Sequence, residues 1–124
     1  MENDIYIFDC EVFAHDWLFV FKEIATGEYT VIHNDNDAVV AFMERNPFLG
    51  GFNNKHYDNF ILKGVMCGLT PEQIKEINDL IIVEEVNGWD IPILREYRVY
   101  FDSFDLMDDC QVGLSLKALS LIHI

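Results

Sequence analysis

The chain has 124 residues, enough for one small domain, and its composition is that of a folded protein, with 51% hydrophobic and 14% aromatic residues. Eight basic residues against 22 acidic ones give a formal net charge of −14, which excludes the broad cationic groove on which non-specific DNA binding depends. No apolar run approaches the roughly 18 residues of a membrane span, and the acidic start lacks the basic residues of a secretory signal. We therefore expect a cytoplasmic protein, of bacterial or phage-infected cells, with no membrane partner. The widely spaced cysteines, without a CxxC pair, indicate buried thiols at Cys10 and Cys67.

Three strands are predicted at the start of the chain. Residues 5–10 form a short apolar run, and residues 17–22 are rich in the aromatic and β-branched side chains typical of strands. A turn at residues 25–28 returns the chain into a third strand over residues 29–33, so the three form an antiparallel meander. Asn34 or Asp35 can then cap a helix over about residues 37–45, which ends at Asn46-Pro47.

The rest of the chain alternates between strands and helices. A short strand over residues 48–52 precedes a helix from about residue 57 to 68. Thr70-Pro71-Glu72-Gln73 is a strong helix start, with a capping residue and a proline at the first position, and this helix should reach Ile77 or Leu80. Residues 80–86 fit a continuation or a strand, residues 98–106 alternate as a strand, and residues 114–119 begin a last helix. This order predicts an α/β fold with a mixed sheet.

The sharpest chemical feature is Phe8-Asp9-Cys10-Glu11, at the end of the first predicted strand. Because side chains alternate between the faces of a strand, Asp9 and Glu11 should point the same way while Cys10 points into the core. Two carboxylates on one face can hold Mg²⁺ or Mn²⁺, which prefer carboxylate and water oxygens. Taken alone, the pair is better explained as the ordinary charged end of a strand.

A second segment, Gly50-Gly51-Phe52-Asn53-Asn54-Lys55-His56-Tyr57-Asp58, joins a predicted strand to a predicted helix. It resembles the second motif of the DEDD-type 3′–5′ exonuclease (proofreading) domains of DNA polymerases, in which an Asn, a spacer, an aromatic residue and an Asp follow one another. Phe8-Asp9-Cys10-Glu11 resembles their first motif, and the order and spacing of the two also match. The segments 104–107 and 113–118 look like the stretch that precedes the third motif, so the resemblance, closest to phage-type enzymes, covers nearly the whole chain.

The resemblance implies two-metal phosphodiester hydrolysis on a ribonuclease H-like (RNase H-like) scaffold, a mixed sheet flanked by helices. Asp9, Glu11 and Asp58 would be the catalytic residues and the ligands of two Mg²⁺ or Mn²⁺ ions, which activate a water and stabilise the departing 3′-oxygen. The implied partners are the 3′ end of single-stranded DNA and a polymerase domain in the same or a partner chain. Bound metal would also offset the negative charge where the phosphate meets the protein.

Substrate-binding candidates are Asn53, Asn54 and Tyr57. The two asparagines could position the terminal nucleotide or shape the turn between strand and helix. Tyr57 and its neighbour His56 could face the substrate, although aromatic packing is the expected role.

Other polar and aromatic residues receive weaker assignments. Phe13 and Phe52 could stack on a base, but core packing is the expected role. Asp105 is interpreted as a structural acid, because the family's pattern does not make it a metal ligand. His15 and His33 are interpreted as ordinary surface or core histidines without an identified partner.

The third motif of the family, which supplies a fourth carboxylate and a Tyr or His that orients the attacking water, has no counterpart after Asp109. We therefore expect residues 1–118 to form a partial exonuclease domain, incomplete at the C-terminus and inactive or very poor by itself. The segment Leu119–Ile124 matches the translation of a transposon end used in a common sequencing-library preparation, and we expect it to be non-native.

Two other functions remain open. One is another RNase H-like exonuclease, of the oligoribonuclease or DNA-repair type. The other is a non-catalytic acidic module, which would show no dependence on divalent cations but leaves the order of the acidic motifs unexplained.

Overall fold

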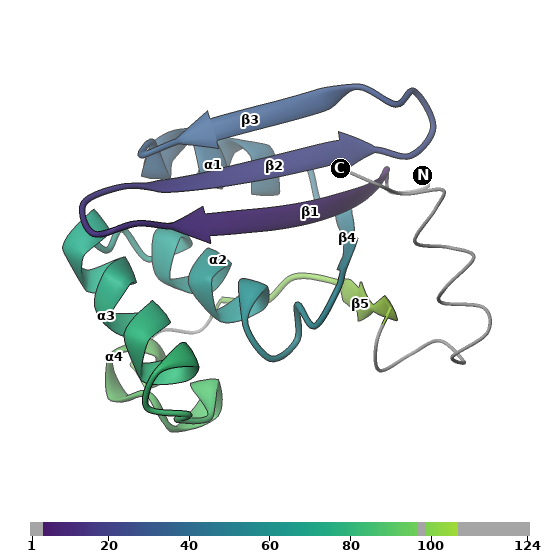
Figure 1. Ribbon diagram of the computed structural model, residues 1–124. Helices are drawn as coiled ribbons and strands as arrows, with labels where there is room; N and C mark the ends of the chain where they lie inside the picture. Colours follow the sequence, from purple (N-terminus) through teal and green to yellow (C-terminus); the bar gives the residue numbers. More distant parts are fainter. Residues whose placement is uncertain (1–3, 97–98, 107–124) are drawn as a thin grey trace.

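The computed structural model describes residues 4–96 and 99–106, and these form a five-stranded mixed sheet with helices packed against it (Figure 1). The strand order is β3-β2-β1-β4-β5. β1 (Ile5–Val12), β2 (Trp17–Glu23) and β3 (Tyr29–His33) form the predicted antiparallel meander. β4 (Phe48–Gly51) pairs with the other edge of β1 in parallel, and β5 (Ser103–Asp105) pairs with β4 in parallel. The prediction of an α/β fold with a mixed sheet is confirmed.

The helices begin where the capping signals place them. α1 (Asn36–Met43) follows Asp35, whose side chain accepts a hydrogen bond from the backbone N of Ala38 at 3.0 Å. α3 (Pro71–Ile82) starts with the predicted capping box, in which Thr70 and Gln73 each bond the backbone of the other. α2 (Asp58–Met66) lies between them, close to its predicted bounds. α3 continues through residues 80–82, which settles the ambiguity there in favour of a helix.

The segment between α3 and β5 differs most from the prediction. It contains the short helices η1 (Gly88–Asp90) and α4 (Pro92–Arg95), which were not predicted. The predicted strand over residues 98–106 is too long, because within the described residues 99–106 only Ser103–Asp105 pairs, along the short strand β4. The predicted last helix, Cys110 and the segment Leu119–Ile124 lie outside the described residues.

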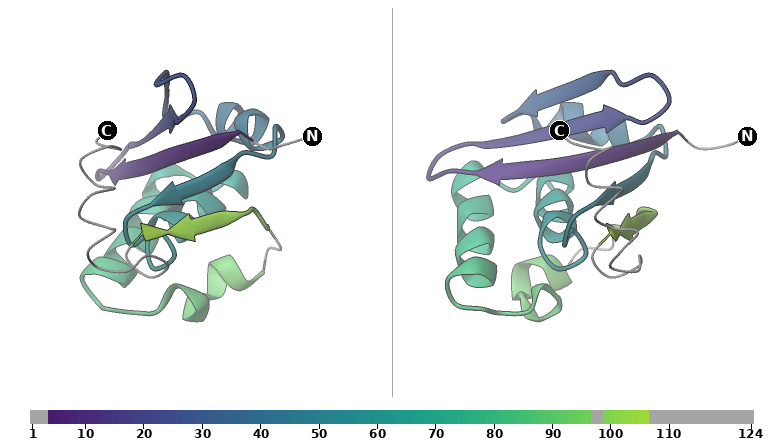
Figure 2. Two further views of the ribbon diagram at one scale, coloured as in Figure 1. Left: turned by 90° about the vertical axis from the view of Figure 1, so that its right-hand side faces the viewer. Right: turned by 45° about the vertical axis from the view of Figure 1, so that its right-hand side comes forward.

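The core lies on one face of the sheet, the face covered by α1 and α2 (Figure 2). Phe8, Phe19 and Phe21 stack across β1 and β2, with ring centroids 5.8–6.4 Å apart. The ring centroid of Phe42 on α1 lies 4.2 Å from that of Phe21 and 5.0 Å from that of Tyr6. Burying each such ring contributes about 1.5–3 kcal/mol, so this aromatic layer fixes the helices against the meander.

The opposite face of the meander carries the acidic pair. Strand register aligns Asp9 with Val20 and Val31, and Glu11 with Leu18 and His33, so all of these side chains share that face. Cys10 is buried on the helix-covered face. The predicted alternation of Asp9, Cys10 and Glu11 is therefore confirmed. Within the described residues, no helix combines the length and the apolar character needed to cross a membrane.

Candidate active site

The two acidic motifs, residues 8–11 and 50–58, meet at the carboxyl ends of the parallel strands. β1, β4 and β5 run parallel, and Figure 2 (left) shows their arrowheads pointing the same way. The chain leaves β1 toward β2 on one side, while β4 and β5 lie on the other side, so the direction of winding changes between β1 and β4. In open α/β sheets, ligands bind outside the carboxyl ends of the strands at such a switch point.

The end of β1 is open toward β4. β4 pairs only with Ile5–Ile7 of β1, so residues 8–12 have a described strand partner only in β2. The start of α2 approaches that unpaired edge, where the Sγ of Cys10 donates a hydrogen bond to Oδ1 of Asp58 at 2.9 Å. The buried thiol thus links the first motif to the second.

The loop between β4 and α2 is fixed by the acid at the end of β5. Asp105 is fully buried and accepts hydrogen bonds from the backbone N of Asn53 at 2.9 Å and of Lys55 at 3.0 Å. Asn53 has a φ of +56°, a left-handed conformation that asparagine tolerates better than most residues. These contacts give Asp105 a structural role and place Asn53 in the turn between strand and helix, where its side chain is exposed.

Asn54 is fully buried inside the same loop. Its Nδ2 donates to Oδ1 of Asn59 at 3.1 Å, and Nδ2 of Asn59 donates to Oγ of Ser103 at 3.0 Å. Its Oδ1 has no hydrogen-bond partner among the described residues. A buried acceptor without a partner costs about 1–3 kcal/mol, so folding alone does not explain an asparagine at this position.

Burial and nearby negative charge raise the pKa of two of the three acids. Asp58 is only 5% exposed, and burial raises its pKa from 3.8 to about 7, with the nearby charge of Asp9 adding to the rise and the Cys10 thiol opposing it. Partial burial of its carboxylate and the charge of Glu11 likewise raise the pKa of Asp9. Among the described residues, no lysine or arginine lowers the pKa of either group. A bound cation would relieve this repulsion.

Cys10 and Tyr57 hold their protons in this cluster. Burial and the charge of Asp58 raise the pKa of the Cys10 thiol well above its ordinary value, so it acts as a hydrogen-bond donor and is a poor nucleophile. Burial also raises the pKa of the Tyr57 hydroxyl, with Cys10 and Asp58 adding to the rise.

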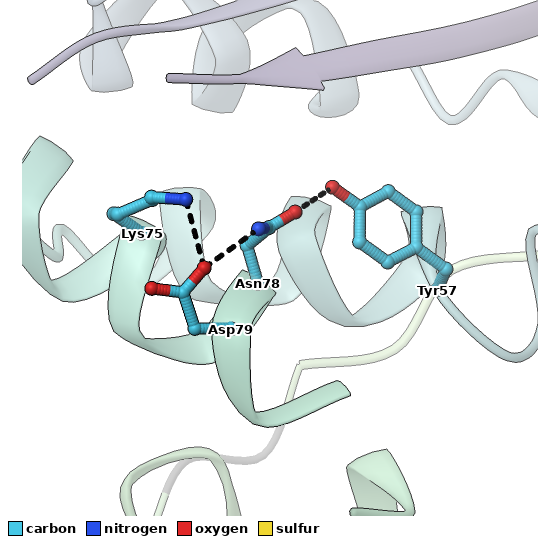
Figure 3. Close-up of polar contacts among 4 residues, drawn as sticks. All are labelled: Tyr57, Lys75, Asn78 and Asp79. Atoms are coloured by element: carbon cyan, nitrogen blue, oxygen red, sulfur yellow. Dashed lines mark hydrogen bonds and ion pairs between the residues drawn. The ribbon is translucent and has the colours of Figure 1, made fainter. Parts of the chain in front are cut away.

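Tyr57 is tied to α3 (Figure 3). Its hydroxyl donates to Oδ1 of Asn78 at 2.5 Å, Nδ2 of Asn78 donates to Oδ1 of Asp79 at 3.1 Å, and Nζ of Lys75 bonds the same oxygen at 2.8 Å. This chain of polar contacts anchors the residue that precedes Asp58. The hydroxyl therefore positions the start of α2, while the ring is half-buried as expected for packing.

The three carboxylates have the chemistry to bind a hard cation, but they are not arranged around a common point. Asp9 and Glu11 reach solvent from one face of β1, whereas Asp58 approaches the strand from the helix-covered side. Within the described part of the chain, no group of three or more His, Cys, Asp or Glu side chains is placed to hold a metal ion. The three carboxylates nevertheless fit Mg²⁺ or Mn²⁺ in chemistry, because both ions prefer carboxylate oxygens.

Several weaker assignments are resolved by the structure. Phe13 is exposed, so its expected core role is wrong, and Phe52 is half-buried. His15 is exposed, and His33 has the partner that the sequence did not reveal, Asp16 at 2.9 Å. Cys67 is half-buried, whereas Cys10 is buried as predicted.

The thiol contact at Asp58 and the amide chain behind Asn54 were not foreseen. Each joins residues far apart in the chain, 48 positions for Cys10 and Asp58 and 44 for Asn59 and Ser103, so no local pattern signals them. Comparison with protein-family models, with curated proteins and with solved structures gave no match.

Proposed function

We propose that this chain carries the first two motifs of a metal-dependent 3′–5′ exonuclease of RNase H-like fold, the proofreading module of a DNA polymerase. The observation that carries the proposal is the contact between the two motifs, in which the thiol of Cys10, the residue between Asp9 and Glu11, bonds Asp58 at the switch point between β1 and β4. A five-stranded mixed sheet with helices packed against it is compatible with an RNase H-like fold. The order of the acids along the chain matches the exonuclease motifs that the two segments resemble.

Each acid has a distinct part in this site. Asp9 and Glu11 reach solvent at the end of β1, where a phosphate can approach, and they would hold the ions from one face. Asp58 is oriented by Cys10 and would complete the ligand set from the start of α2. When bound, two Mg²⁺ or Mn²⁺ ions activate a water and stabilise the departing 3′-oxygen. Asn53, exposed in the loop after β4, is available to position the terminal nucleotide, whereas Asn54 is buried and would support that loop.

Because the chain is strongly acidic, most of the DNA binding would come from another domain. With a net charge of −14, this chain repels phosphates until cations bind at Asp9, Glu11 and Asp58, which we call the acidic edge. A polymerase domain, in the same or a partner chain, would then hold the duplex and deliver a single-stranded 3′ end.

Metal binding is the most direct test of this site, because it depends on the three acids alone. Calorimetric titration with Mn²⁺ should show saturable binding that Asp9→Asn, Glu11→Gln and Asp58→Asn each weaken about tenfold or more, the loss of one charged ligand contact. Asp37→Asn, an exposed acid on α1, is the matched control and should leave the affinity unchanged. Equal affinities in all variants would rule out this site.

A non-catalytic acidic module is the second candidate, favoured by the absence of a preformed group of three ligands among the described residues. The two proposals separate on a single strand labelled at its 5′ end. Slow Mn²⁺-dependent shortening from the 3′ end, lost in Asp9→Asn, supports the exonuclease. Faster shortening of RNA than of DNA would instead favour an oligoribonuclease.

A further inference from the structure

A cavity of about 1030 Å³ opens on the side of α2 that faces away from the acidic edge. Asp58 contacts Cys10 on β1, whereas its neighbour Asn59 and, one turn later, Lys63 line the cavity. The remaining walls come from the end of α3, from η1 and α4, and from Val99, Tyr100, Phe101 and Ser103. α2 therefore stands between two different surfaces.

Basic residues gather in this cavity against the trend of the whole chain. Lys55, Lys63 and Arg95 line it, three of the eight basic residues of the protein. Among the described residues of the lining, Glu85 is the single acid, although the chain has 22 acids. A local excess of positive charge in a protein of net charge −14 points to an anionic ligand.

Aromatic rings flank the same cations. Trp89 is 70% exposed and Tyr100 is 84% exposed, an unusual position for rings of this size. Trp89 is held edge-on by Phe60, with ring centroids 5.3 Å apart and planes at 89°. Phe60 in turn packs on Gly88, where a Cβ would collide with the Phe60 ring. The turn at η1 thus exposes Trp89 at the cavity, with one edge of the ring against Phe60.

We infer that this cavity binds a nucleotide unit, with the base stacked on Trp89 or Tyr100 and the phosphate bound by Lys55, Lys63 or Arg95. Ligand sites measure about 300–1,000 Å³, so the cavity has room for a mononucleotide or for one or two nucleotides of a strand. An acidic peptide would leave the rings unused, and an apolar ligand would leave the basic side chains unused. The inference goes beyond the exonuclease proposal, because it uses neither the three acids nor a metal.

Trp89 itself reports on binding. The protein has two tryptophans, and the other, Trp17, is 0% exposed, so a ligand in the cavity changes the emission of Trp89 alone. The chain is titrated in EDTA with dTMP, thymidine, inorganic phosphate, a glutamate-rich peptide and a short oligo(dT). Saturable quenching by dTMP, at least about tenfold tighter than by thymidine or phosphate, is the expected result, since stacking and charge contacts both contribute.

The source of the nucleotide follows from the oligo(dT) titration. Tighter binding of the oligonucleotide than of dTMP, weakening as salt rises, assigns the cavity to a strand. Equal or weaker binding assigns it to free nucleotides. If neither dTMP nor oligo(dT) binds saturably, or if the glutamate-rich peptide binds and these two do not, the inference is overturned.

Matched variants decide whether the cavity is the binding site. Lys63→Met and Arg95→Gln should each weaken dTMP binding about tenfold. Lys22→Met removes the same charge from β2, outside the lining of the cavity, and should leave binding unchanged. A loss in Lys22→Met equal to that in Lys63→Met would reduce the effect to net charge and overturn the site. Asp9→Asn should retain nucleotide binding while losing Mn²⁺, so the two proposals can fail separately.

Discussion

Asp58 occupies an unfavourable position for an acid. It is buried beside a second carboxylate, and its only described side-chain donor is a thiol. A residue kept where it destabilises the fold is expected at a functional site. The same reasoning applies to Asn54, whose Oδ1 is buried without a described partner.

Replacing Asp58 should therefore stabilise the protein. The folded-state pKa of about 7 lies above the ordinary value of 3.8, so the folded protein holds a proton that the unfolded chain releases between these pH values. The free energy of unfolding should fall as pH rises from about 4 to 7, by up to about 4 kcal/mol at roughly 1.4 kcal/mol per pKa unit. Asp58→Asn keeps an acceptor for the Cys10 thiol and should be more stable than the parent at pH 8, with a flatter pH profile.

Urea unfolding at pH 5 and pH 8 measures this difference. Asp37→Asn, exposed on α1, should not change the pH profile. An Asp58→Asn variant that is less stable than the parent at pH 8 would contradict the assignment of a raised pKa.

At the scale of elements, the site depends on how β5 supports the loop between β4 and α2. Asp105 replaces missing partners for two backbone N–H groups, and Tyr57 ties the following helix to α3. Periodicity and capping residues predicted most elements, including α1, α2, α3 and the meander. η1 and α4 were missed because such short helices show no apolar repeat, although Asn87 and Pro92 mark their starts.

Asp105→Ala should destabilise the protein by about 2–4 kcal/mol, since two hydrogen bonds to a buried carboxylate are lost. It should also loosen the loop that positions Asp58, so hydrogen exchange at the amides of Asn53 and Lys55 should quicken. Asp102→Ala, an exposed acid in the segment leading to β5, is the control and should change neither quantity. Unchanged exchange in Asp105→Ala would contradict its role as the support of the loop.

At the scale of the whole molecule, charge is divided between two sides of α2. The acidic edge carries Asp9, Glu11 and Asp58, and the opposite cavity gathers three cations. Sequence reasoning located the acids, because alternation along a strand and two short motifs are local signals. It did not locate the cavity, because Lys63, Trp89 and Arg95 come from three elements that meet only in the folded chain. The strand order was equally out of reach, since pairing between β1 and β4 joins residues far apart in sequence.

Paramagnetic broadening of backbone amide signals by substoichiometric Mn²⁺ tests the central claim most directly, because 22 acids offer many places for diffuse binding. In a protein of 14.4 kDa these signals can be followed residue by residue. A metal site at the switch point predicts that the signals of residues 9–11 and 57–59 broaden first. Broadening that begins instead at exposed acids of α1 or α3, or that spreads evenly over the acidic surface, would contradict the account.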